Sequence, residues 1–576
     1  MKFHSLILFF ILLIMPLAKL CGQVAIPKGY FSSPLNIDLT LTGSFSEVRA
    51  NHFHSGIDFS IQQKVGLPVF AVADGIVSRI KVSPVGFGNA LYIDHPNGFT
   101  SVYAHLNGYN DTITSYLRTN QYMVKSFEVD LFPKNKKEYI YVKKGQIIGY
   151  AGNSGSSGGA HLHFELRNTA TENIINPLLF DFAIPDNYPP FIDFIKLYPE
   201  DDNSFIGNAN DDIRFNLKKS GNREYRLATK DTLSLWGNFS LGVQAFDFNQ
   251  NQSDRNGFYS LKMFVDKIEF FSMVCDSFAF SESRYVNASI DYASNYISGN
   301  RIIKSKKLEG NQLSFFKTES SNSVLTFCDN KPHEVTVQVD DVTGNAVNLR
   351  FWVKPQKPAG FVQVPVIADS DSNISFRYNK INKFETKDLK VEFPIGSLYE
   401  DMVFRYRKSP GGNGYFSDVH YLHSAETPIH SRIKVSIKLT KLPPKLQSKV
   451  LLVRIDKNGK RSPAGGSYDN GYVSATTNIF DGYAIVVDTV PPIIKPWGEN
   501  NKSKTSIKFT VSDNFSGIKT YKGTINGKWV LVEWDPKNKL MTYKFDMMIE
   551  TGKNTFVLYL EDEKGNSSTY TTTILK

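Results

Sequence analysis

Two histidines stand two positions apart in the segment GGAHLHFELR, residues 158–167. The segment has the pattern of a strand. Successive strand side chains point to opposite faces, so His161 and His163 share one face and Leu162 takes the other. Two imidazoles on one face can act together on a metal ion or on a substrate. For an isolated pair, a half-exposed strand with two solvated histidines is the simpler interpretation, so the rest of the chain has to decide.

Two earlier segments carry further side chains of the same chemical kind. In NHFHSGIDFS, His54 stands four residues before Asp58, and imidazole with carboxylate is a suitable ligand pair for zinc. Gly56 between them favours a bend or an extended loop over a helical turn. His105 ends the apolar strand of SVYAHLNG. Taken singly, His54 and Asp58 would be ordinary surface residues, and His105 would be a packed or capping histidine.

Taken together, these residues predict a zinc site. His54, Asp58 and His163 offer two nitrogens and one carboxylate oxygen, which leaves one of four coordination positions open, as in catalytic Zn²⁺ sites. His105 and His161 then remain as unligated imidazoles near the metal. Such groups can take a proton from water and stabilise the oxyanion of a tetrahedral intermediate.

The elements that would position these residues are short alternating strands. From 23 to about 185 the pattern predicts a compact antiparallel β domain without a long amphipathic helix. Two strand–turn–strand units are expected, with turns at Asp74-Gly75 and Asn97-Gly98. The irregular, lysine-rich stretch at about 107–141 is predicted to be an insertion between two strands. Four other residues are expected to be structural or peripheral: His52, His95, Tyr103 in the core, and Asn153 in a loop near the site.

The chain has 576 residues, far too many for one core. Two phrases recur, PDNYPP with DTVPP and DDVTGNAV with EDEKGNSS. They predict immunoglobulin-like sandwiches at about 188–355 and 490–576, with another β-rich domain at about 360–487. The predicted fold class is therefore all-β, a compact antiparallel β-sheet domain followed by several β-sandwich domains. The later modules could also be spacers without chemistry of their own.

The N-terminal stretch MKFHSLILFFILLIMPLAKLCGQ has the pattern of a secretory signal peptide at residues 1–22. An uncleaved anchor is the alternative, but the apolar run is short for a spanning helix, and no other spanning segment is expected. Leu20 fits poorly where lipidation of Cys21 would need a small residue. An exported chain permits a disulfide between Cys275 and Cys328, and two free thiols are the open alternative.

Charge limits the class of partner. The formal net charge is +10 and the isoelectric point is near 9.0, which suits an anionic partner such as a cell-wall polymer, lipid headgroups or nucleic acid. The sequence has no recognisable nucleic-acid fold signature, so no nucleic-acid partner is expected.

Five segments, in order, resemble a known family: HSGIDF, PVFAVADGIV, GFGNALYIDHPNGFTSVYAHL, VKKGQIIGYAGNSG and HLHFELR. They are similar to the LytM/lysostaphin-type zinc metallopeptidases, which cut peptide bonds in peptidoglycan. The resemblance covers about 50–180, less the insertion. It implies that His54, Asp58 and His163 are the zinc ligands and that His105 and His161 are the catalytic histidines.

The resemblance implies a secreted zinc endopeptidase that cuts stem or crosslink peptides of peptidoglycan, in the periplasm or outer envelope. The β modules would position it or bind envelope proteins. Two rivals stay open: a non-catalytic regulator of another wall hydrolase, and a surface adhesin or assembly protein with a vestigial peptidase domain. The 107–141 insertion departs from the family pattern, and it could shape the cleft or obstruct it.

Overall fold

The computed structural model describes residues 26–249, 255–318, 323–361, 374–498 and 505–576. The predicted signal peptide and Cys21 lie outside these ranges. Strands hold 46% of the chain and helices 8%, so the predicted all-β class is confirmed. Among the described residues, no helix is long and apolar enough to cross a membrane.

The N-terminal domain, residues 26–185, is built on one antiparallel sheet with the path β1-β4-β13-β8-β7-β6-β10. In the central strand β13, Leu162, Phe164 and Leu166 are fully buried, and the positions between them carry the polar side chains. The strands of this path are β1 (Leu41–Gly43), β4 (Ile57–Ser60), β13 (His161–Asn168), β8 (Phe99–Ala104), β7 (Asn89–Asp94), β6 (Gly75–Val82) and β10 (Val129–Leu131).

Of the two expected strand–turn–strand units, β7 and β8 form a hairpin, whose turn contains Gly98 at a φ of 82°. The turn at Asp74-Gly75 instead joins two sheets. β6 pairs with β7 on one side and with β10 and β11 (Tyr141–Val142) on the other, so it has no free edge for β5 (Pro68–Phe70). That strand pairs with β12 (Ile147–Tyr150) in a separate three-stranded sheet, which β9 (Gly108–Tyr109) completes.

The expectation that this domain lacks a long helix is wrong. Helix α1 spans Asp111–Val124, within the stretch predicted to be an insertion. Asn110 caps it by accepting a hydrogen bond from the Ile113 backbone N–H at 3.0 Å. Only Ile113, Leu117 and Gln121 are buried. This narrow stripe, four residues apart in a polar segment, explains why the pattern gave little sign of a helix.

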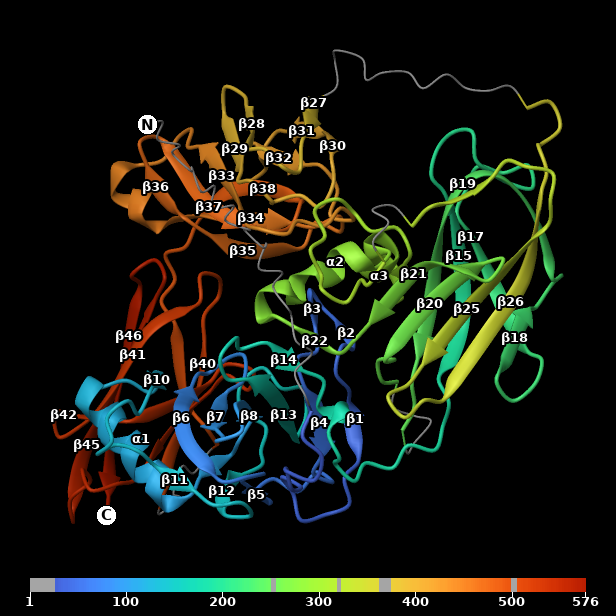
Figure 1. The fold of residues 1–576 in the computed structure, drawn as a ribbon. Coiled ribbons are helices and arrows are strands. Elements are labelled where there is room, and N and C mark those ends of the chain that lie inside the picture. Colours follow the sequence, from blue (N-terminus) through green and yellow to red (C-terminus); the bar gives the residue numbers. More distant parts are fainter. Residues whose placement is uncertain (1–25, 250–254, 319–322, 362–373, 499–504) are drawn as a thin grey trace, which may run out of the picture.

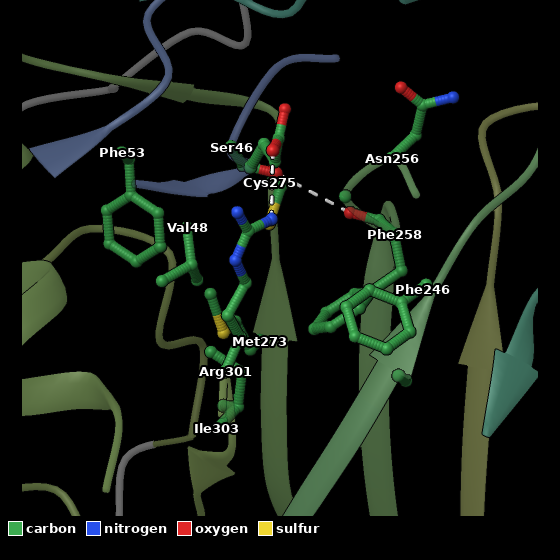
Figure 2. Close-up of a pocket in the computed structure, with 13 residues that line it drawn as sticks. Ser46, Val48, Phe53, Phe246, Asn256, Phe258, Met273, Cys275, Arg301 and Ile303 are labelled. Atoms are coloured by element: carbon green, nitrogen blue, oxygen red, sulfur yellow. Dashed lines mark hydrogen bonds and ion pairs between the residues drawn. The ribbon is translucent and has the colours of Figure 1, made fainter. Parts of the chain in front are cut away.

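The first β domain, residues 191–355, shares a continuous hydrophobic core with the N-terminal domain. Figure 2 shows the seam between them, a small hollow beside buried Cys275. Cys275 and the exposed Cys328 are both free thiols. The main strands are β15 (Phe191–Pro199), β17 (Ile213–Lys219), β18 (Glu224–Leu227), β19 (Thr232–Phe246), β20 (Ser260–Val265), β21 (Ile268–Val274), β25 (His333–Asp340) and β26 (Ala346–Pro355), and helices α2 (Val286–Ser289) and α3 (Tyr292–Ser298) lie between β21 and β25.

The middle β domain, residues 374–487, packs two five-stranded sheets around a core of its own. Its central strands are β29 (Leu389–Phe393), β33 (Ile433–Lys438) and β37 (Tyr472–Thr477) in one sheet, and β32 (Val419–Leu422), β38 (Gly482–Val487) and β34 (Val450–Ile455) in the other. The edge strands are β28 (Asn382–Glu385), β36 (Ser467–Asp469), β31 (Tyr406–Ser409) and β35 (Arg461–Gly465).

The C-terminal β domain, residues 493–575, packs two four-stranded sheets around a third core. Figure 1 shows it in red beside helix α1 of the N-terminal domain. Its strands are β39 (Ile493–Pro496), β40 (Ser506–Ser512), β44 (Leu540–Lys544) and β43 (Val532–Asp535) in one sheet, and β42 (Lys528–Val530), β41 (Ile518–Ile525), β45 (Lys553–Asp562) and β46 (Ser567–Leu575) in the other.

Candidate metal centre

The structure brings His54, Asp58 and His163 to one point. Asp58 in β4 is the direct cross-strand partner of His163 in β13, and His54 directly follows the short strand β3 (His52–Phe53). The Asp58 Oδ1 atom lies 3.1 Å from His54 Nε2 and 2.9 Å from His163 Nδ1, and the two nitrogens are 3.0 Å apart. Each of the three residues is 3% exposed.

The local backbone requires a glycine between two of these residues. A Cβ atom at Gly56 would stand 2.3 Å from the Phe164 carbonyl oxygen of β13 and 3.1 Å from the His163 ring. Only glycine lets β4 approach β13 closely enough at this point. The bend or extended loop expected from Gly56 is therefore a close strand contact that sets the spacing of the site.

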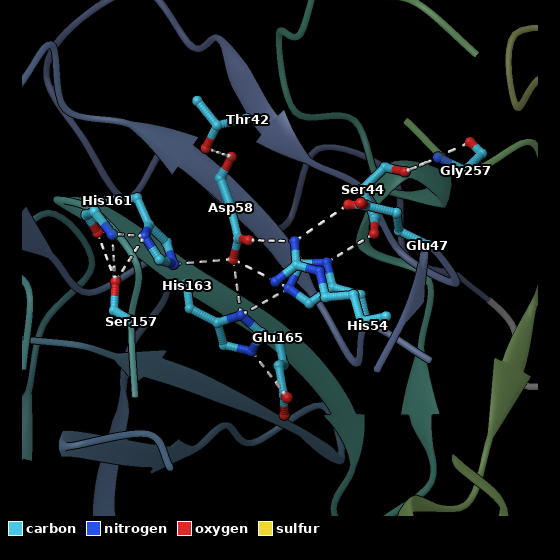
Figure 3. A network of polar contacts seen from close by, with 12 residues as sticks. Thr42, Ser44, Glu47, His54, Asp58, Ser157, His161, His163, Glu165 and Gly257 are labelled. Atoms are coloured by element: carbon cyan, nitrogen blue, oxygen red, sulfur yellow. Dashed lines mark hydrogen bonds and ion pairs between the residues drawn. The ribbon is translucent and has the colours of Figure 1, made fainter. Parts of the chain in front are cut away.

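The outer nitrogen of each ligand imidazole faces a hydrogen-bond acceptor (Figure 3). His54 Nδ1 lies 2.7 Å from the Ser44 carbonyl oxygen, and His163 Nε2 lies 3.0 Å from Glu165 Oε1. Each outer nitrogen therefore donates its N–H, which leaves a lone pair on the inner nitrogen. Burial alone would lower the pKa of His163, but Asp58 and Glu165 outweigh it and raise the pKa to about 9, so a cation bound at this point would take the place of a proton on the inner nitrogen of His163.

A cation resolves this arrangement. Zinc bonds of about 2.0–2.1 Å place tetrahedral ligand atoms roughly 3.3 Å apart, close to the 2.9–3.1 Å separations observed. The outer acceptors are those that usually orient zinc-bound imidazoles. The residues present therefore fit a zinc ion.

Buried charges surround the three residues. Arg49 donates to Asp58 Oδ2 at 2.7 Å. Burial alone would raise the pKa of Asp58, but His54, His161 and His163 outweigh it and hold the pKa well below its usual value. Behind His163, fully buried Glu165 pairs with Arg167 at 2.6 Å.

Sequence reasoning did not single out the supporting residues Ser44, Arg49, Glu165 and Arg167. For Glu165 and Arg167 a signal existed, because they continue the same strand face as His161 and His163. For the Ser44 carbonyl and Arg49 no local pattern was available.

The two predicted catalytic histidines lie beside the cluster, with ring centroids 4.8 Å apart. His105 directly follows β8 and lies in the left-handed region, at a φ of 58°, and its Nδ1 lies 2.9 Å from the Ser154 carbonyl oxygen. His161 Nδ1 lies 2.9 Å from the Gly159 carbonyl oxygen, and its Nε2 lies 3.3 Å from Asp58 Oδ1. Burial, together with His163 and His161, lowers the pKa of His105 to about 3, so this imidazole is neutral near pH 7.

The other residues discussed from sequence lie outside the cluster. His52 is exposed, while His95 is buried and bonds to the Asp74 carbonyl and to Ser101. Tyr103 is fully buried in the core. Asn153 lies in the loop that leads to the site, as expected.

The rim of the site carries a contact from the far end of the chain. Lys537 of the C-terminal β domain donates to Asn153, both at its carbonyl oxygen and, at 3.0 Å, at its side chain, and to the Ser157 carbonyl at 3.1 Å. On α1, Arg118 pairs with Glu533 at 3.0 Å. A cleft of about 460 Å³ lies between the two domains and reaches Leu106 and Ser154, the chain neighbour and the hydrogen-bond partner of His105.

Comparison with known proteins covers parts of the chain. Residues 52–177 match peptidase family M23, and residues 373–488 match a Zu5-like domain. The DD-carboxypeptidase/endopeptidase Mpg of Neisseria meningitidis is 31% identical over 133 residues, 23% of this chain and 24% of that protein. The peptidoglycan DD-endopeptidase ShyA of Vibrio cholerae is 33% identical over 113 residues, 20% of each chain.

The matched region spans between a fifth and a quarter of these relatives' own length. Among solved structures, the catalytic domain of lysostaphin from Staphylococcus simulans is 26% identical over 23% of this chain and 86% of that chain, with a TM-score of 0.17. The family match includes the three predicted ligands, His54, Asp58 and His163, and the two neighbouring histidines, His105 and His161. Residues 52–177 are therefore a peptidase family M23 domain of the LytM type.

Proposed function

We propose that the N-terminal domain is a zinc metalloendopeptidase that hydrolyses peptide bonds in the stem or crosslink peptides of peptidoglycan. One observation carries the proposal. The inner nitrogens of His54 and His163 and one oxygen of Asp58 converge within 3.1 Å. Two unligated imidazoles stand next to this point.

The residues of the site have two roles: some would bind the zinc ion, and others would transfer protons or stabilise charge. His54, Asp58 and His163 would hold the zinc ion, and Ser44 and Glu165 orient the two ligand imidazoles. When bound, zinc supplies a Lewis acid that polarises the scissile carbonyl and acidifies water. The Nδ1–H of His105 donates a hydrogen bond to the Ser154 carbonyl oxygen. Its Nε2 is therefore free to accept a proton from the attacking water. His161 stands beside it, where it can stabilise the charge that develops on the carbonyl oxygen.

The substrate class and location are supported more indirectly. The matched relatives include proteins named as peptidoglycan DD-endopeptidases, and a net charge of +10 favours an anionic polymer. The N-terminal pattern of a signal peptide supports export to the periplasm or outer envelope. In this proposal the later β domains position the enzyme or bind envelope proteins.

Digestion of purified peptidoglycan tests the proposal, with zinc content measured on every sample. Wild type is expected to release muropeptides. His163→Ala should lose both zinc and activity. His161→Ala should keep zinc and lose roughly 10²–10⁴-fold in rate. The exposed neighbour His52→Ala serves as the matched control and should behave as wild type.

Two outcomes would count against the enzyme. Wild type that binds zinc but cuts nothing would favour the regulator, with the cleft between α1 and the C-terminal β domain as the obstruction. Wild type without zinc would remove the enzymatic proposal and favour a function in the β domains.

A further inference from the structure

Two of the β domains carry three aspartates at equivalent places relative to their strands, separate from the metal centre at His54, Asp58 and His163. The first member lies shortly before each domain's opening strand, as Asp186 before β15 and Asp488 before β39. These residues open the recurring phrases DNYPP and DTVPP. The chain therefore enters both domains through the same short sequence.

The second and third members also occupy equivalent places. Asp247 directly follows β19, and Asp513 directly follows β40. Asp341 and Asp562 open the turns before the last strands, β26 and β46. In both turns the Oδ1 atom accepts the backbone N–H of the asparagine four residues on, at 2.9 Å from Asn345 to Asp341 and 2.8 Å from Asn566 to Asp562.

In the C-terminal domain the three carboxylates meet. Asp488, Asp513 and Asp562 each present an oxygen, and these oxygens lie within 4.8 Å of one another. Asp488 is 1% exposed and Asp562 is fully buried. Asp513 Oδ1 is buried and has no hydrogen-bond partner. Among the described residues, none of the three forms an ion pair with a lysine, arginine or histidine.

The equivalent aspartates of the first β domain include buried oxygens that lack a partner. Asp247 is 4% exposed, and its Oδ1 atom makes no hydrogen bond. Burial, and then the charges of Asp186 and Asp341, raise the pKa of Asp247 well above its usual value. Asp186 Oδ1 also lacks a partner. No described cationic side chain pairs with any of the three.

Such clusters are unfavourable as they stand. A buried carboxylate without a partner is costly, and a second negative charge beside it adds repulsion. A bound cation satisfies the free oxygens and removes the repulsion. Oxygen ligands bound at 2.3–2.6 Å to one ion can stand up to about 5 Å apart, which accommodates the 4.8 Å limit of the C-terminal cluster.

We propose that each cluster binds a calcium ion, at Asp186, Asp247 and Asp341 in the first β domain and at Asp488, Asp513 and Asp562 in the C-terminal β domain. The donors are all oxygens, without histidine or cysteine, and this set selects a hard cation and not zinc. Calcium accepts six to eight oxygens in flexible geometry, whereas magnesium demands a near-ideal octahedron.

The position of each cluster gives the ion a structural role. Asp488 lies in the segment between β38, the last strand of the middle β domain, and β39, the first strand of the C-terminal β domain. An ion bound there would connect Asp488, in the segment between the two domains, to Asp513 directly after β40 and Asp562 at the end of β45. It would fix the orientation of the C-terminal β domain, whose Lys537 contacts the loop beside the histidine cluster.

Equilibrium dialysis of the full chain against radioactive calcium tests the proposal, with zinc supplied equally to all samples. A calcium concentration of about 1 mM is suitable, because extracellular modules bind with dissociation constants of roughly 10⁻⁴–10⁻³ M. Wild type should bind two ions per chain. Asp247→Asn and Asp513→Asn should each bind one, and the double variant none.

Two exposed carboxylates provide matched controls. Asp211→Asn in the first β domain and Glu563→Gln, next to Asp562, remove the same charge from the surface and should retain two ions. Wild type that binds no calcium would overturn the proposal, as would a double variant that still binds two ions.

Thermal unfolding of the wild type gives a readout that does not depend on how well the variants fold. Calcium should raise the midpoint of wild-type unfolding, because it binds the folded clusters only. The double variant should show no such rise. A wild-type midpoint that calcium leaves unchanged would contradict the proposal.

Discussion

At the scale of single residues, the side chains behind the ligands matter as much as the ligands. Glu165 is fully buried, accepts from His163 Nε2, and pairs with Arg167. Burial alone would raise its pKa, but Arg167 and His163 reverse this and lower it to about 2. Glu165 therefore stays ionised and keeps the outer proton on His163, so that the inner nitrogen can bind metal.

Glu165→Gln is expected to weaken zinc binding by roughly 10–100-fold, the usual effect of losing a carboxylate behind a ligand histidine. It should also destabilise the fold, because Arg167 loses its buried counter-charge. Titration with a competing chelator measures the affinity, and exposed Glu172→Gln is the control. Unchanged zinc affinity in Glu165→Gln would show that the hydrogen bond does not set the orientation of His163.

At the scale of elements, helix α1 is the notable departure from the expected β pattern. Besides the Arg118–Glu533 pair, Tyr122 on its surface packs edge-on against Trp529, with ring centroids 5.1 Å apart, and donates to Asp546. Helix α1 is therefore a docking element for the C-terminal β domain. Both members of the ion pair are partly exposed, and such pairs contribute only about 0.2–1 kcal/mol each.

The contacts that hold the C-terminal β domain beside the cleft are weak. Removing them is expected to increase the rate of peptidoglycan cleavage. The double variant Arg118→Ala with Lys537→Ala should cleave intact sacculi faster by up to about tenfold, since about 1.4 kcal/mol corresponds to a factor of ten. Cleavage of a small soluble peptide and zinc content should stay the same. Initial rates on both substrates measure this.

Lys539→Ala, which removes an exposed lysine of the same turn, is the control and should leave both rates unchanged. A slower rate on sacculi in the double variant would mean that the C-terminal β domain helps to bind the substrate and does not restrict access to it.

At the scale of the whole molecule, the aspartate clusters link stability to pH. Burial and Asp341 raise the pKa of Asp186 to about 7, against about 3.9 in an unfolded chain. A group whose pKa is raised on folding contributes stability below its unfolded pKa, and this contribution is lost as the pH rises through the folded value. The calcium-free protein should therefore lose stability as the pH rises from about 4 to about 7.

Calcium is expected to restore more stability at pH 8 than at pH 6, because protons compete for Asp186 and Asp247 at the lower pH. Urea unfolding at both pH values, with and without calcium and with zinc supplied equally, measures the difference. In Asp186→Asn this pH dependence should shrink. An equal effect of calcium at both pH values would contradict the explanation.

Local patterns determined much of this protein. Strand alternation placed His161 and His163 on one face, and the combination of His54, Asp58 and His163 indicated a metal site. Short apolar alternation with glycine turns indicated an all-β chain, and the recurring aspartate phrases indicated repeated domains. The all-β prediction is confirmed, because strand period and turn residues are local properties of the sequence.

Only the tertiary structure decided the rest. The cross-strand pairing of Asp58 with His163 and the orienting contacts from Ser44 and Arg49 depend on register between distant segments. β5 and β6 lie in different sheets because β7, β10 and β11 pair with both edges of β6. The docking of α1 on the C-terminal β domain, and the meeting of Asp488, Asp513 and Asp562, join residues far apart in the chain. Such contacts leave no short-range pattern, because long-range packing selects them.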